Sequence, residues 1–344
     1  MTMADTFHSA QTARTAEAVA ALVGETPLLE IRYRIDGKPR RIFAKYESMN
    51  MTGSVKDRMA LHILRRAHER NELQPGDCIA EASSGNTGIS FSAIGRALGH
   101  RVRIFMPDWM SQERVTLMHS LGADVIPVSK AQGGFVGSIE MAETYAREHE
   151  AVFLPRQFAS NANVEAHELT TGPEIERQLR MMGLEADVFV AGVGTGGTVM
   201  GIGGYLRSTG RAVRVHPLEP ANSPTLRTGT RVGSHRIQGI SDEFIPSIVR
   251  LDDLDEIVDA WDGDAILMAQ KLCYALGLAV GISSGANVIG AIDLLEKAGG
   301  DATVVTLLPD SNKKYLSTAL YHAEPPQDGY TTPRVQFEGV SAVR

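Results

Sequence analysis

Short runs of β-branched and apolar residues alternate along the chain with longer segments in which apolar residues recur every three or four positions. The short runs predict strands, and the longer segments predict helices with one buried face. Because the two kinds of segment alternate, we expect an α/β fold with open, mostly parallel sheets flanked by helices. Strands are expected at 101–106, 124–128, 187–191, 212–218 and 303–308, and helices at 59–70, 89–98, 135–149 and 265–276.

The length of the chain predicts two domains. Its 344 residues exceed the roughly 250–300 residues at which single hydrophobic cores stop growing. We expect a smaller domain over 46–155 and a larger one formed by 1–45 together with 156–344, around one cleft. Open parallel sheets bind ligands beyond the carboxyl ends of their strands. The loops that follow the strands are therefore where we expect the chemistry.

Composition narrows the class of protein. A hydrophobic fraction of 43% and a charged fraction of 22% exclude disordered, collagen-like and disulfide-scaffold proteins. A formal net charge of −7 predicts no binding to nucleic acid or to a membrane surface. Cys78 and Cys273 fit no metal or disulfide pattern, and the N-terminus lacks the basic start of a signal peptide. We expect a cytoplasmic enzyme without a metal, and a surface-hugging or mobile tail after His322.

A lysine stands at the start of a predicted helix, in the segment GSVKDR. Taken alone, Lys56 would be a solvated surface residue. The positive end of a helix dipole and partial burial both favour the neutral amine. That is the form that a Schiff-base lysine or a general base requires, so the other motifs decide the role of Lys56.

Three loops rich in small residues each open a predicted helix. EASSGNTGIS (81–90) offers hydroxyl, amide and backbone donors to a carboxylate or phenolate oxygen, although an ordinary capping turn explains it equally well. The glycines of GVGTGGTVMGIGG (192–204) let successive N–H groups surround a phosphate at a helix N-terminus. In GISSGAN (281–287), Ser283 could face a heteroaromatic nitrogen or simply cap the helix.

The second loop also fits a dinucleotide-binding fold. Gly192, Gly194 and Gly197 match G-x-G-x-x-G, and Glu219 ends the next predicted strand, where such a fold places its ribose-binding carboxylate. This alternative, an NAD-binding oxidoreductase, leaves Lys56 and the other two loops without a role. A non-catalytic binding module is a further alternative, and the presence of Lys56 argues against it.

Taken together, the four motifs resemble the cysteine synthase and cystathionine β-synthase family of fold-type II pyridoxal-phosphate (PLP) enzymes. The resemblance extends from GETPL at 24–28 to KYLST at 314–318. It implies PLP bound as a Schiff base to Lys56, an active site in the interdomain cleft, and a homodimer. Asn86 would bond the phenolic oxygen of PLP, and Ser283 would meet its pyridine nitrogen. The phosphate would be bound by Gly194, Thr195, Gly196, Gly197 and Thr198, and the substrate carboxylate by Ser83, Ser84, Asn86, Thr87 and Gln157.

The resemblance also implies a reaction. In it, Lys56 removes the α-proton of a serine-derived amino acid, the β-substituent leaves, and a thiol, sulfide or amine adds to the resulting aminoacrylate. Cysteine synthesis from O-acetylserine and sulfide is the simplest case.

The chain departs from the family pattern at two places. Ala82 and Ser83 stand where Pro and Thr are common, and Asp242 and Glu243 stand where ordinary cysteine synthases have small residues. The acidic pair could bind a second substrate, act as a base, or form a solvated turn. Cystathionine synthesis, the use of O-phosphoserine, serine or cysteine, and sulfide release from cysteine therefore remain alternatives.

Overall fold

The computed structural model describes residues 14–240 and 243–344. The chain forms two compact units. Unit 1 contains the residues up to Gly24 together with Asn50–Ala162, and unit 2 contains Glu25–Met49 together with Asn163–Arg344. Each unit has its own sheet flanked by helices, and most strand pairs are parallel. The expected α/β class with two open, mostly parallel sheets is confirmed.

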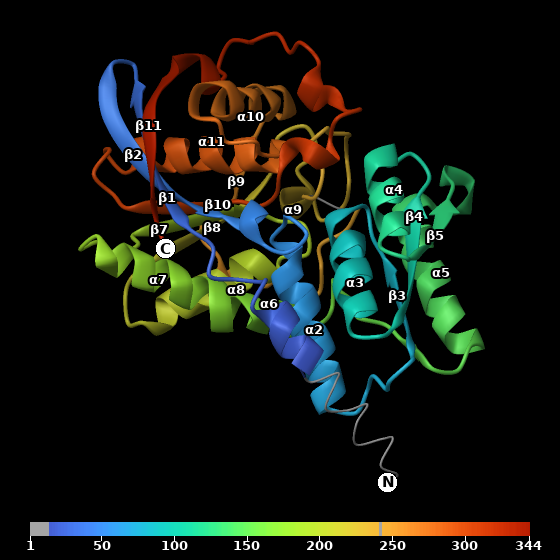
Figure 1. Cartoon of the computed structure of the whole chain (residues 1–344). Coiled ribbons are helices and arrows are strands. Elements are labelled where there is room, and N and C mark those ends of the chain that lie inside the picture. The colour runs from blue at the N-terminus through green and yellow to red at the C-terminus, as the bar shows by residue number, and fades with distance from the viewer. Residues whose placement is uncertain (1–13, 241–242) are drawn as a thin grey trace. The chain divides into compact units, whose positions relative to one another are not determined.

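The sheet of unit 1 is parallel throughout its described strands, in the order β5-β4-β3-β6. All five residues of the central strand β3 are buried, because helices cover both faces. Figure 1 shows α3 on one face and α5 on the other. The strands are β3 (Cys78–Ala82), β4 (Arg101–Pro107), β5 (Asp124–Val128) and β6 (Val152–Phe153), and the helices are α2 (Lys56–Glu69), α3 (Asn86–Ala97), α4 (Gln112–Ser120) and α5 (Gly134–Glu148).

The sheet of unit 2 has the order β11-β1-β2-β10-β7-β8-β9 among the described residues. The pairs from β2 to β9 are parallel, and β1 is antiparallel to both β2 and β11. Helices α7 and α8 lie on one side of this sheet, and α10 and α11 on the other (Figure 1). The strands are β1 (Leu28–Ile35), β2 (Lys38–Tyr46), β7 (Val188–Gly192), β8 (Arg214–Pro220), β9 (Val258–Ala260), β10 (Val304–Leu308) and β11 (Val335–Val343). The helices are α7 (Gly172–Met181), α8 (Gly197–Ser208), α9 (Thr225–Thr228), α10 (Asp262–Leu276) and α11 (Ile282–Lys297), while α6 (Asn161–Ala166) spans the border of the two units.

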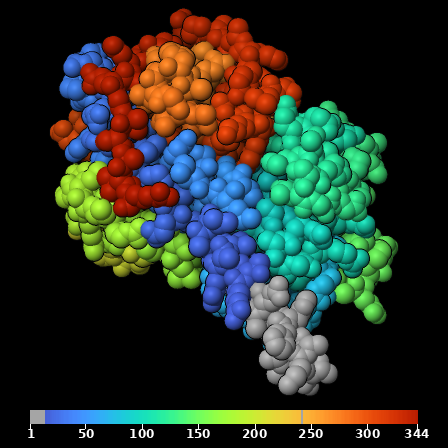
Figure 2. Space-filling model, viewed as in Figure 1, coloured from blue at the N-terminus to red at the C-terminus, as the bar shows by residue number. Residues whose placement is uncertain are grey.

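An antiparallel layer at the edge of this sheet was not predicted from the sequence. The β1–β2 hairpin turns at Asp36 and Gly37, whose φ angles of 49° and 79° are those of a tight two-residue hairpin turn. The tail after His322, expected to hug the surface or to be mobile, ends in β11, which pairs with β1 from Leu28 to Ile35. It runs over the surface of unit 2 as a narrow ribbon (Figure 2). Within the described ranges, no helix is long and apolar enough to cross a membrane.

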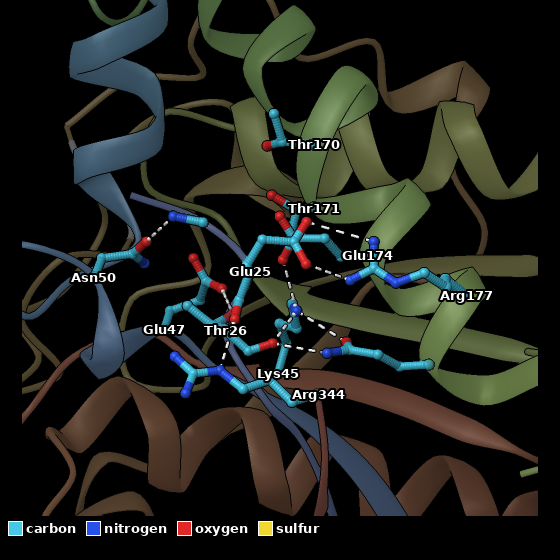
Figure 3. A network of polar contacts seen from close by, with 12 residues as sticks. Glu25, Thr26, Lys45, Glu47, Asn50, Thr170, Thr171, Glu174, Arg177 and Arg344 are labelled. Carbon is cyan, nitrogen blue, oxygen red and sulfur yellow. Dashed lines mark hydrogen bonds and ion pairs between the residues drawn. The ribbon is translucent and has the colours of Figure 1, made fainter. Parts of the chain in front are cut away.

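A buried ion pair fastens this edge to the helices. Lys45 is fully buried near the end of β2, and its Nζ lies 2.7 Å from Glu174 on α7. The same ammonium donates to the Gln178 side chain at 2.9 Å and to the carbonyl of Thr26. Gln178 in turn donates to the carbonyls of Thr26 and Val343. Figure 3 shows how these contacts join β2, α7, the segment before β1 and the C-terminal strand.

We predict that Lys45→Met lowers the free energy of unfolding by about 3–5 kcal/mol, because the carboxylate of Glu174 would remain buried without its counter-ion. Arg177→Ala is the matched control in the same network (Figure 3), since Arg177 and Glu25 form an exposed pair with side chains 47% and 69% accessible. Such a pair contributes at most about 1 kcal/mol. Urea unfolding of both variants measures the difference, and equal losses would show that the buried pair is not the fastening contact.

Candidate active site

Lys56 is the first residue of α2 and is half-buried. Asp57 holds the loop that precedes it. The Asp57 carboxylate accepts hydrogen bonds from the Thr52 N–H at 2.6 Å and from the Thr52 hydroxyl at 2.5 Å. It also accepts one from Ser90 on α3 at 2.6 Å. The turn before Lys56 is therefore fastened to two helices by one buried carboxylate, a role of Asp57 that the sequence did not reveal.

The loop between β3 and α3 is shaped by Ser83. Its hydroxyl accepts hydrogen bonds from the N–H groups of Gly85 at 3.1 Å and Gly88 at 2.8 Å. A β-carbon at Gly85 would lie only 2.6 Å from Nε of the buried Arg114, so this position requires glycine. Asn86 and Thr87 then open the helix α3. Ser83 thus organises the loop that presents the next residues, in addition to any contact with substrate.

Gln157 lies beside Thr87, although the two are 70 residues apart in sequence. The Thr87 hydroxyl donates to Oε1 of Gln157 at 2.7 Å, and Nε2 of Gln157 donates to the carbonyl of Ala82 at 2.7 Å. The structure therefore brings together two residues that the resemblance assigned to the substrate carboxylate. Both are buried, with 4% and 3% of their surface accessible.

Glu81 is hydrogen-bonded to Gln157 of this pair and was not identified from the sequence as a site residue. Its carboxylate accepts hydrogen bonds from the N–H groups of Ala82 at 2.9 Å and Gln157 at 3.2 Å. Burial raises the pKa of Glu81 to about 7, and the backbone N–H donors and the charge of Arg156 oppose that rise. A carboxylate in the buried strand CIAEA was the clue available from sequence, because buried charges are rare without partners.

The predicted phosphate loop follows β7 and opens α8, as expected. Gly196 has φ +89°, and a β-carbon there would lie 2.1 Å from Val249. A β-carbon at Gly194 would meet the carbonyl oxygen of Gly239 at 2.4 Å, and one at Gly197 would meet Asn163 at 2.0 Å. The N-cap residue of α8 is Gly196, which has no side chain, and the Thr195 hydroxyl accepts a long hydrogen bond of 3.4 Å from the N–H of Gly197. The loop therefore presents backbone N–H groups at a helix N-terminus, which is a site for an anion.

Two side chains of a neighbouring helix support the threonines of this loop. Asn163 on α6 donates to the Thr195 hydroxyl at 2.9 Å. His167 begins a π-helical turn (His167–Thr171), and its Nε2 lies 3.3 Å from the Thr198 hydroxyl. Both residues are almost fully buried. These partners could not be predicted, because they lie about 30 residues before the loop that they support.

Ser283 is the second residue of α11 and is 5% exposed. One turn further along the same helix, the Asn287 side chain accepts from the N–H of Gly192 at 2.8 Å and donates to the carbonyl of Leu307 at 3.0 Å. These bonds fix the start of α11 to the ends of β7 and β10. Ser283 and the phosphate loop consequently belong to the same edge of the unit 2 sheet.

Of the acidic pair, Asp242 lies outside the described residues. Glu243 is partly exposed, and its carboxylate lies 3.3 Å from Arg231. The preceding Gly239 and Ile240 pack against the phosphate-loop segment, since β-carbons at Gly194 and Gly192 would collide with them. The segment that leads into the acidic pair is therefore in contact with the loop.

Comparison with known proteins agrees with these features. The family model described as "Pyridoxal-phosphate dependent enzyme" matches residues 19–310. The cysteine synthase of Staphylococcus aureus is 38% identical over 303 residues, which cover 88% of this chain and 96% of that protein. Among solved structures, a hydrogen sulfide-producing enzyme of Fusobacterium nucleatum is 51% identical with a TM-score of 0.93, covering 96% of this chain and 99% of the other. An Asp-to-Asn variant of the hydrogen sulfide-producing enzyme has been solved with an α-aminoacrylate intermediate. The cysteine synthase of Entamoeba histolytica is 34% identical with a TM-score of 0.82, covering 92% and 93%.

We predict that Gly196→Ala weakens PLP binding at least tenfold, because the left-handed backbone and the contact with Val249 leave no room for a β-carbon. Gly204→Ala is the matched control in α8, the helix that Gly196 precedes, because a β-carbon at Gly204 would meet nothing within 4 Å. Alanine should stabilise that position by about 0.5–1 kcal/mol. Dialysis against graded PLP, followed by absorbance, measures affinity. Unchanged PLP affinity in Gly196→Ala would exclude this loop as the phosphate site.

Proposed function

Because the chain belongs to the family of pyridoxal-phosphate-dependent enzymes and is a β-replacement enzyme of the cysteine synthase type, we propose that it forms cysteine from O-acetylserine and sulfide. One observation carries the proposal. The cysteine synthases that it resembles match along almost their whole length, and the chain retains a lysine at the start of α2 together with the glycine loop before α8.

The residues present fit PLP. The start of α8 presents backbone N–H groups to an anion, and glycines there are required by packing. Ser283 offers a neutral hydroxyl at the same sheet edge, suited to an unprotonated ring nitrogen. PLP, when bound, serves as the electron sink that stabilises negative charge at the α-carbon of the substrate. We assign its phosphate to Gly194–Thr198, its phenolic oxygen to Asn86 and its ring nitrogen to Ser283.

Lys56 has two roles in this proposal. Its Nζ would hold the cofactor covalently at rest, and would be freed when a substrate amine takes its place. The released amine then removes the α-proton and later returns a proton to the same carbon. The turn fastened by Asp57 holds Lys56 at the start of the helix, so the amine remains within reach after its release.

The substrate carboxylate is assigned to the loop of unit 1. Ser83, Ser84 and Asn86 offer hydroxyl and amide donors, and Thr87 offers its backbone N–H, at the N-terminus of α3, where the helix dipole favours an anion. Gln157 completes the set beside Thr87. These donors are uncharged, so they orient the carboxylate by hydrogen bonds.

Sulfide release from cysteine is the second candidate, favoured by the 51% identity to the hydrogen sulfide-producing enzyme. In this direction the Cβ–S bond of cysteine breaks and sulfide leaves. Water can then add at Cβ, giving serine, and Asp242 would accept the proton of that water. The two candidates share Lys56 and differ in which group adds to the β-carbon.

We predict that borohydride reduction attaches PLP to Lys56, and that Lys56→Ala lowers both cysteine formation and sulfide release by at least about 10³-fold through loss of the general base. Lys130→Ala, an exposed lysine of unit 1, is the control and should retain both activities. Peptide mass spectrometry locates the reduced adduct, and an adduct on another lysine would overturn the assignment.

Asp242→Asn tests the second candidate. We predict about a hundredfold loss of sulfide release from cysteine, with less than a threefold loss of cysteine formation, because sulfide needs no base to become a nucleophile. Glu243→Gln, at the carboxylate that faces Arg231, is the matched control and should change neither rate. Initial rates of both reactions, with serine and pyruvate measured as products, give the comparison. Equal losses in both directions would remove Asp242 from water activation.

The homodimer implied by the family resemblance and the cytoplasmic location expected from the N-terminal sequence remain predictions. Sedimentation of the purified chain and fractionation of the cell that produces it would test them.

A further inference from the structure

Glu81 sits in a cradle of backbone donors. It is 6% exposed at the fourth position of β3. Besides the N–H groups of Ala82 and Gln157, the N–H of Arg156 bonds to its carboxylate. Arg156 has φ +50°, a left-handed conformation that is uncommon for a residue other than glycine. Successive N–H groups around such a residue form an anion-binding concavity, so the backbone of 156–157 is bent around the carboxylate.

The hydrogen bond from the Ala82 N–H to the Glu81 carboxylate requires a residue with a backbone N–H at position 82. The backbone N–H of Ser83 donates to the Phe105 carbonyl of β4 at 3.0 Å. Because successive N–H groups along a strand point to opposite sides, the N–H of Ala82 points away from β4. There the neighbouring strand β6 pairs only with Cys78 and Ile79, and Glu81 supplies the acceptor instead of a strand carbonyl. Proline, which is common at this position in the family, has no N–H to donate.

We propose that Glu81 is a positioning residue whose ionised carboxylate holds Gln157 against Thr87, so that proton uptake by Glu81 weakens binding of the amino-acid carboxylate. The inference rests on the assignment of Thr87 and Gln157 to that carboxylate. Glu81, Gln157 and Ala82 form a closed ring of hydrogen bonds, and Thr87 is attached to it through its bond to Gln157.

Protonation would break this ring near neutral pH. Burial raises the pKa of Glu81 to about 7, and Arg156 is the charged side chain among the described residues whose field lowers it. A pKa raised above its ordinary value means that Glu81 takes up its proton as the pH falls through about 7. In the protonated form, one oxygen of Glu81 carries a hydrogen. The carboxyl group then presents an O–H donor to the backbone N–H donors and has one acceptor fewer for them. The loop and Gln157 are therefore held most firmly above pH 7.

The test compares two probes on the holoenzyme. L-Alanine has the α-carboxylate but no leaving group, and ethylamine lacks the carboxylate while sharing the amine. The ratio of their dissociation constants, measured by calorimetry, isolates carboxylate recognition from titration of the amine. In the wild type, the advantage of L-alanine should grow about tenfold from pH 6 to pH 8, as one group with a pKa of about 7 ionises. In Glu81→Gln the advantage should be small and independent of pH.

Two further variants separate positioning from folding. Ala82→Pro keeps the carboxylate but removes one donor, so the midpoint of the wild-type profile should move to higher pH. Glu219→Gln is the matched control, because Glu219 is a fully buried glutamate near the end of β8 that accepts a backbone N–H from Leu226 at 2.6 Å. It should leave the L-alanine advantage and its pH profile unchanged.

Three results would overturn the proposal. The first is a wild-type pH profile in Glu81→Gln, and the second is an equal loss of L-alanine and ethylamine binding in that variant. The third is an Ala82→Pro variant whose pH midpoint equals that of the wild type. The last keeps the proposal testable if Glu81→Gln does not fold. Because L-alanine does not react at its β-carbon, these measurements stay valid even if the enzyme forms no cysteine and releases no sulfide. Failure of the proposed reaction and failure of the Glu81 inference are therefore distinguishable.

Discussion

Hydrogen bonds from loop N–H groups to buried carboxylates hold the reactive part of unit 1 in place. Backbone N–H groups in loops before helices lack partners within the helix, and burial makes an unmet donor costly. Asp57 meets this need in the turn before Lys56, and Glu81 meets it at Ala82 and Gln157. Charged acceptors make these bonds stronger than bonds between neutral groups. Internal carboxylates therefore fix the backbone from which Lys56, Thr87 and Gln157 extend.

The phosphate loop of unit 2 is held by uncharged side chains instead of by carboxylates. Neutral groups support the phosphate loop, with Asn163 bonded to Thr195 and His167 to Thr198. Around Gly196, close packing leaves no space for a side chain. An internal carboxylate at this helix N-terminus would compete with a phosphate for the N–H donors and would repel it. The placement of charge thus matches the ligand that each loop is proposed to bind. The loop proposed to bind the amino-acid carboxylate is held by internal carboxylates, and the loop proposed to bind the phosphate is held by neutral side chains.

The parallel core could be predicted from the sequence because its signals are local. The run 124–128 is β5 residue for residue, and the helix expected at 135–149 is α5 shifted by one position. The site loops were also visible, since glycine and hydroxyl residues between a strand and a helix have a local meaning. The hairpin at Asp36–Gly37 has a local turn signal but was not predicted, and β11 depends on pairing with β1 across 300 residues or more. Glu81 and His167 could not be assigned, because their roles come from partners distant in sequence.

The central claim is that Lys56 removes and returns the α-proton while the β-substituent is replaced. Cysteine made from sulfide and O-acetyl-L-serine deuterated at the α-carbon, in ordinary water, tests it by mass spectrometry. A lysine ammonium carries three equivalent hydrogens, so the account predicts that at most about a third of the product retains deuterium. Full retention in the cysteine would mean that the group on the β-carbon is displaced directly, and would contradict the account.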